Sequence, residues 1–107
     1  MNIQEANDIL FKNNVVKSIS IEFDQSEFGY NLQLELMQSP DRAQSSICVE
    51  FIDISNLELK CFGGGLNQFM HLSISKNRSG MERIRYQLQE NEEDKITFSF
   101  KRFHILY

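Results

Sequence analysis

The chain has 107 residues, of which 41% are hydrophobic and 24% charged, and its formal net charge is −4. This size fits one domain around one core, residues 1–107, and the composition is that of a globular protein rather than a disordered one. The negative charge argues against non-specific binding to nucleic acid or to an anionic membrane, because both depend on basic patches. It is compatible with a basic protein partner.

The opening segment is expected to form a short helix. Its apolar residues recur at helical spacing: Ile3, Ala6, Ile9 and Leu10. Asn2 is a candidate N-cap, and the two asparagines at 13–14 would end the helix. This segment is too polar for a signal peptide, and the chain has no run of apolar residues long enough to cross a membrane. We therefore expect a cytoplasmic protein.

Alternating apolar and polar residues then indicate strands with one buried face. The alternation covers residues 18–23 and 30–36, and the polar turn between them predicts a hairpin. A polar loop that contains Pro40 follows. In residues 47–54 the apolar phase shifts by one at Ile52, which predicts a bulge or a strand buried on both faces.

The second half of the chain continues the same pattern. A turn at residues 55–56 and a strand over 57–61 predict a second hairpin, which the glycines at 63–65 would close. Further strands are predicted over residues 70–75, where Met70, Leu72 and Ile74 would face inward. The last two are predicted at 84–88 and 96–101, and the apolar phase shifts again at Phe103 and Ile105. The predicted fold is mainly β, an antiparallel sandwich or partly open barrel of about seven strands with a short N-terminal helix.

The three consecutive glycines have no phosphate-loop context. A phosphate loop leads into a helix and in its Walker form ends in Gly-Lys-Ser/Thr, whereas here a strand pattern follows. Glycines at a strand junction more often permit a positive φ or a sharp twist. We interpret them as a turn.

Cysteine and histidine provide no recognisable catalytic or metal-binding motif. Cys48 and Cys61 have no second cysteine or histidine at ligand spacing, so they are expected to pack as small apolar residues and to bind no metal. His71 and His104 could meet a cysteine only in space, as a nucleophile and base would. An enzyme that uses His71 stays open as an alternative, as does a small-ligand-binding β-barrel with a Phe-rich interior.

Carboxylates on the polar strand faces are the candidate contacts for a basic partner. The strand positions are Glu22, Glu35, Glu50, Asp53 and Glu58, and the turn positions are Glu92, Glu93 and Asp94. Solvated strand faces and an exposed turn are the ordinary explanations, but charge complementarity would favour binding of a basic protein. The C-terminal third is locally basic, yet Tyr86, Phe98 and Phe100 are predicted to face inward, so no nucleic-acid partner is expected.

The second half of the chain also contains sequence runs that are similar to those of a known class of proteins. The run VEFIDISNLEL at 49–59, the FGGG at 62–65 and the ITFSF at 96–100 lie within a stretch, residues 47–105, that carries the resemblance. It resembles small β-rich bacterial proteins that include immunity proteins encoded beside polymorphic or contact-dependent growth-inhibition toxins. The resemblance implies a cytoplasmic, non-enzymatic protein without a cofactor, which binds and neutralises a toxin domain, often a nuclease. No contact residue follows from the resemblance itself.

Overall fold

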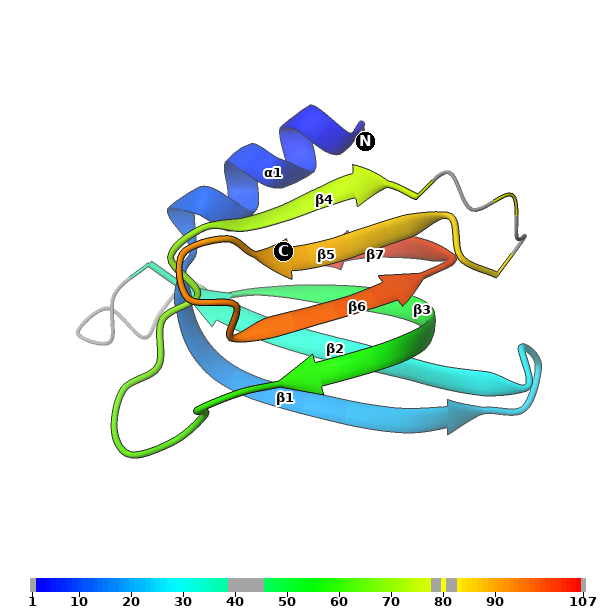
Figure 1. Ribbon diagram of the computed structural model, residues 1–107, viewed down its shortest axis with the longest axis horizontal. Helices are drawn as coiled ribbons and strands as arrows, with labels where there is room; N and C mark the ends of the chain where they lie inside the picture. Colours follow the sequence, from blue (N-terminus) through cyan, green and yellow to red (C-terminus); the bar gives the residue numbers. More distant parts are fainter. Residues whose placement is uncertain (1, 39–45, 78–79, 81–82, 107) are drawn as a thin grey trace.

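The computed structural model describes residues 2–38, 46–77, 80 and 83–106. Within them, one helix precedes seven antiparallel strands, and the sheet does not close (Figure 1). The elements are α1 (Ile3–Lys12), β1 (Val15–Asp24), β2 (Gly29–Met37), β3 (Ser46–Leu59), β4 (Leu72–Lys76), β5 (Tyr86–Glu90), β6 (Ile96–Phe100) and β7 (Arg102–Leu106). The predicted fold, an open antiparallel β structure behind a short helix, is confirmed. The polar loop with Pro40 lies outside the described residues except at its ends.

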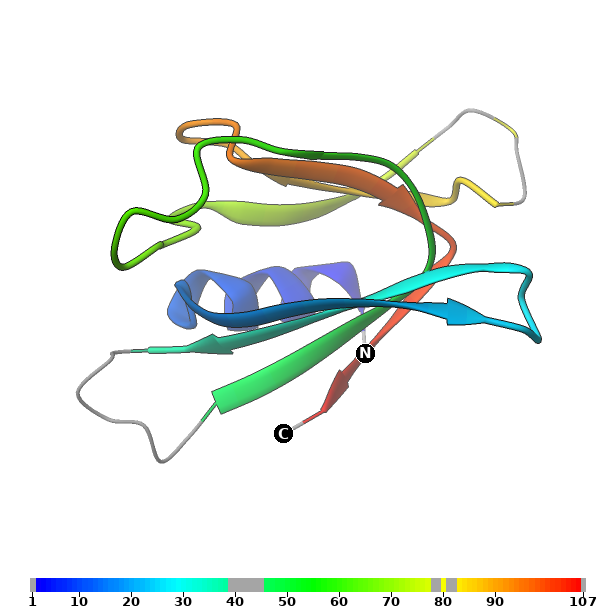
Figure 2. The same cartoon turned by 90° about the horizontal axis from the view of Figure 1, so that it is seen from below.

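The strands form two layers that share β3. The first half of β3 pairs with β2 and β7, and its second half pairs with β6. One layer therefore contains β1, β2, the first half of β3 and β7, and the other contains the second half of β3, β6, β5 and β4. Figure 2 shows the two layers one above the other, with β3 passing between them. We call them the β1 layer and the β4 layer.

Two residues in the left-handed region let β3 change layers. Asp53 has φ of 57° and Asn56 has φ of 56°, and the pairing register shifts beside each of them. The predicted bulge after Ile52 is thus confirmed. The predicted turn at 55–56 and the second hairpin are wrong, because Asn56 bends the strand without ending it. Asn and Asp adopt the left-handed region more easily than most residues, which explains their use here.

The helix begins as predicted and covers the edge of the β4 layer. The Asn2 side chain accepts a hydrogen bond from the Glu5 amide at 2.8 Å, and Ala6 and Leu10 are buried. Asn7 binds the backbone of β4 twice, since its Nδ2 donates to the Ile74 carbonyl at 3.1 Å and its Oδ1 accepts from the Ile74 amide at 2.7 Å. This side chain therefore supplies the pairing that a further strand would give to β4.

The core lies between the two layers and is rich in phenylalanine. The Phe51 ring lies 5.0 Å from the Phe98 ring and 4.9 Å from the Phe100 ring, in edge-to-face contacts that suit aromatic pairs. Leu72 and Ile74 face inward as predicted. Met70 does not, and 44% of it is exposed, because β4 begins only at Leu72.

The loop after β3 contains the three glycines and returns to β1. Gly63, Gly64 and Gly65 have φ of 102°, 75° and 121°, so their role in a turn is explained by backbone conformation. They lead into residues 67–69, which bind the start of β1. The Val16 amide donates to the Asn67 carbonyl at 3.0 Å, and the Phe69 amide donates to the Asn14 carbonyl at 2.8 Å.

Candidate functional site

Four carboxylates lie on the outer face of the β1 layer, on three neighbouring strands. Glu22 and Asp24 lie on β1, Glu35 on β2 and Glu50 on β3. The register pairs Glu22 with Asn31 and Glu35 with Ser18, while Gln33 pairs with Glu50. Side chains that face each other across paired strands share one face of a sheet. We call these four residues the acidic face; an open hollow lined by Glu22, Asp24 and Glu50 lies on it.

Neighbouring polar groups hold two of these carboxylates in their charged form. Glu35 accepts hydrogen bonds from Ser46 at 2.8 Å and Ser18 at 3.1 Å, and Lys17 lies 3.4 Å away. These contacts, chiefly that with Ser46, lower the pKa of Glu35. Hydrogen bonds from Ser26 and Asn31 likewise lower the pKa of Asp24.

Within the described residues, one lysine forms an ion pair with the acidic face. Lys17 forms an ion pair with Glu35, and Glu50 accepts a hydrogen bond from the neutral Gln33 at 3.2 Å. In the described ranges, Glu22, Asp24 and Glu50 form no ion pair with a lysine or arginine. His104 on β7 is the register partner of Glu50. The face therefore carries a net negative charge toward solvent.

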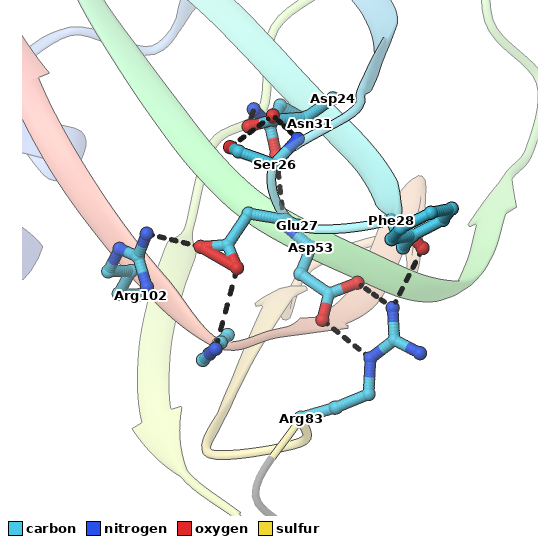
Figure 3. Close-up of polar contacts among 9 residues, drawn as sticks. Asp24, Ser26, Glu27, Phe28, Asn31, Asp53, Arg83 and Arg102 are labelled. Carbon is cyan, nitrogen blue, oxygen red and sulfur yellow. Dashed lines mark hydrogen bonds and ion pairs between the residues drawn. The ribbon is translucent and has the colours of Figure 1, made fainter.

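The predicted contact Asp53 has a different position. Only 5% of it is exposed, and its two oxygens accept hydrogen bonds from Nε and Nη2 of Arg83, each at 2.7 Å (Figure 3). Its expected place on the exposed outer face is wrong, because the bulge that contains this left-handed residue places its carboxylate against Gly29 and Arg83. Arg83 also donates to the carbonyl of Phe28 at 3.2 Å. Through Arg83, this buried carboxylate therefore connects β3 with the segment before β5 and with the β1–β2 turn.

The sequence did not indicate the contacts that Asp53 and Glu27 make with residues distant in the chain. Glu27, in the β1–β2 turn, forms an ion pair with Arg102 (Figure 3). It forms a second ion pair with Lys101 at 3.5 Å. The only local signal was the shift of apolar phase after Ile52, which marked an unusual backbone but no partner. Both contacts join residues distant in sequence, so alternation along one strand could not reveal them.

The remaining predicted contacts lie on the β4 layer or at its end. Glu58 is exposed near the end of β3 and lies 3.8 Å from Lys60. Glu92, Glu93 and Asp94 are exposed in the β5–β6 turn, where the buried Glu90 carboxylate accepts the amides of Glu92 at 2.7 Å and Glu93 at 3.0 Å. The predicted set thus divides between the acidic face and a separate turn.

Among the described residues, no hydrogen bond joins a histidine to a cysteine. Burial and the nearby carboxylates of Glu35 and Glu50 raise the pKa of the Cys48 thiol, so its nucleophilic thiolate is disfavoured. His71 is exposed just before β4, where its ring meets that of Phe11 edge-on at 6.4 Å. Across the described ranges, no three of His, Cys, Asp and Glu come together as metal ligands.

No helix within the described residues is long and apolar enough to cross a membrane. Comparison with protein-family models, with curated proteins and with solved structures gives no match to this chain.

Proposed function

We propose that this chain is a non-enzymatic binding protein, an immunity protein that neutralises a basic toxin domain by covering it with the acidic face. The observation that carries this proposal is the gathering of Glu22, Asp24, Glu35 and Glu50 on one outer face, where the described residues provide one ion-paired lysine, Lys17. The alternating strand pattern and the resemblance of residues 47–105 to toxin-immunity proteins support the same class of function.

The geometry suits electrostatic recognition of a protein. Side chains on the outer face of a sheet have fixed spacing, and here three strands present carboxylates whose neighbours are mostly Ser, Asn and Gln. Charge complementarity of this kind accelerates encounter and selects against acidic partners. A nuclease holds nucleic acid in a basic cleft, and an acidic surface over that cleft would exclude the substrate by charge and by bulk.

Other features favour binding over catalysis or the storage of a small ligand. The raised pKa of Cys48 lowers its reactivity, and the phenylalanine rings fill the interior where an apolar ligand would lie. A surface function requires neither a reactive group nor an internal cavity.

The direct test is to identify a toxin domain among the genes that neighbour this one and to co-express it with this chain. Cells should survive with the chain and die without it, and equal killing in both would refute the immunity role. The surface is tested by Glu22→Lys/Glu50→Lys, with Glu92→Lys/Glu93→Lys as a control that changes the net charge equally. We expect the first pair to slow association at low salt by about tenfold and the control to have a much smaller effect. If both pairs act equally, the acidic face is not the binding surface.

A further inference from the structure

Among the described residues, the outer edge of β1 has no backbone partner over most of its length. β1 is the last strand of its layer and, among the strands of the described residues, pairs with β2 alone (Figure 1). Residues 67–69 bind its first residues, and in the described part of the chain no backbone hydrogen bond reaches this edge beyond Val16. The free stretch therefore runs from Ser18, after the bulge at Lys17, to Asp24, where the turn begins.

This edge lacks the protection that the chain gives to β4. There the helix covers the strand, and Asn7 binds the backbone of Ile74. Exposed strand edges are usually blocked by proline, by clustered charge or by a covering element, because they otherwise pair with another chain. β1 contains no proline, and although Glu22 and Asp24 lie on its outer face, two apolar side chains on its inward face, Ile21 and Phe23, are 47% and 51% exposed.

The direction of the backbone groups follows from the register. In antiparallel strands the amide and carbonyl of successive residues point alternately toward and away from the partner. The Val16 amide points away from β2, since it binds Asn67, and the extra residue at the bulge shifts this alternation by one. Ile19, Ile21 and Phe23 therefore direct their amides and carbonyls to the free edge.

We propose that two copies of this chain associate through their β1 strands, which pair antiparallel about a two-fold axis at Ile21. Ile21 is the midpoint of the free stretch from Ser18 to Asp24. A two-fold axis there places the free stretch of one copy against the same stretch of the other. The pairing ends on each side where the bulge and residues 67–69 already occupy the edge.

The side chains of β1 are complementary to themselves in this register. Ile21 lies opposite Ile21 of the second copy, and Ile19 lies opposite Phe23 of the second copy. On the outer face, Ser20 lies opposite Glu22 and Ser18 opposite Asp24, so no two like charges face each other directly. Apolar pairs opposite each other stabilise a sheet, whereas directly opposed like charges destabilise it. These matched pairs, together with the symmetry of the free stretch, favour a second copy over an unrelated strand.

The first test is the oligomeric state of the full chain by sedimentation equilibrium, up to about 1 mM protein. We expect a monomer–dimer equilibrium that Ile21→Lys weakens at least about tenfold, because two lysines would then face each other at the axis. The control is Phe11→Lys, which also replaces an exposed apolar residue by lysine, at a 63% exposed position on α1 outside the paired stretch, and should leave the dimer unchanged. Circular dichroism verifies that both variants are folded.

Cross-linking tests the register independently of that variant. In a Cys48→Ala/Cys61→Ser background, Ile21→Cys should form a disulfide between copies, since opposed Cα atoms at such a position lie about 5.5 Å apart. Phe23→Cys should not, because its copies would lie roughly 14 Å apart along the strands. A chain that stays monomeric, a dimer that Ile21→Lys leaves intact, or equal cross-linking at both positions would overturn the proposal. If Ile21→Lys instead abolishes binding of a partner to a monomeric chain, the edge belongs to that partner.

Discussion

The replacement Gly29→Ala tests whether the close approach of two strands at Asp53 shapes the fold. Gly29 is buried at the start of β2, and a Cβ added there would lie 2.3 Å from Oδ1 of Asp53 and 3.2 Å from its Cγ. Its φ lies outside the left-handed region, so space rather than backbone conformation requires glycine. Asp53 cannot easily move, because Arg83 holds both of its oxygens.

The expected loss of stability follows from two opposing effects. Forcing extra volume into a packed site costs about 1–3 kcal/mol. Against this, alanine restricts the unfolded chain more than glycine does, which stabilises the folded state by about 0.4–1 kcal/mol. The clash is the larger effect, so we expect Gly29→Ala to lower the free energy of unfolding by about 1–2 kcal/mol. For a domain of this size the midpoint of thermal unfolding would fall by roughly 4–16 °C.

Urea denaturation of a double-mutant cycle separates the clash from other effects. Asp53→Gly removes the opposing carboxylate and keeps a residue that tolerates the left-handed backbone. In that background, Gly29→Ala should be neutral or should stabilise the chain by up to about 1 kcal/mol, since only the effect on the unfolded state remains. An equal loss in both backgrounds would refute the close approach as the cause.

Two further predictions concern polar contacts. Asn7→Ala should lower the free energy of unfolding by about 1–3 kcal/mol, because it leaves the amide and carbonyl of Ile74 without their partner. The control Gln4→Ala, on the exposed side of α1, should cost much less. Similar losses for both variants in urea denaturation would contradict the role of Asn7. Because the pKa of Glu35 is lowered in the folded state, this carboxylate stabilises the fold at pH values above its ordinary pKa of 4.5, and the contribution is lost as the pH falls through the lower pKa of the folded state. Glu35→Gln should therefore flatten the decline in the free energy of unfolding below pH 4.5. The exposed control Glu92→Gln should leave that decline unchanged.

The strands were predictable where one face of a segment is buried. Alternation along residues 18–23, 30–36 and 96–101 located β1, β2 and β6, because burial on one side leaves a period of two in the sequence. The helix was predictable from its spacing and from Asn2. The prediction failed at Asn56, where the same residue type that is typical of turns produces a bulge inside a continuous strand.

The candidate site was predictable only as far as strand faces are. Glu22, Glu35 and Glu50 were predicted to face outward, and they meet because β1, β2 and β3 are neighbours, which alternation does not reveal. Asp53 shows the limit of prediction from alternation, since the bulge at this left-handed residue interrupts the alternation of the strand. Its partner Arg83 lies thirty positions away in the chain, and nothing local connects the two.

The dimer interface at β1 and the binding surface on the acidic face should respond oppositely to salt, so that each proposal can be tested independently of the other. Each copy has a formal net charge of −4, and pairing through β1 brings two acidic faces into one sheet, so screening by salt should strengthen the dimer. Binding of a basic partner to the acidic face depends on attraction, and the same screening should weaken it. A dimer that weakens with salt would contradict pairing through the apolar residues Ile19, Ile21 and Phe23. Partner binding that does not change with salt would contradict the role of Glu22 and Glu50 without affecting the dimer.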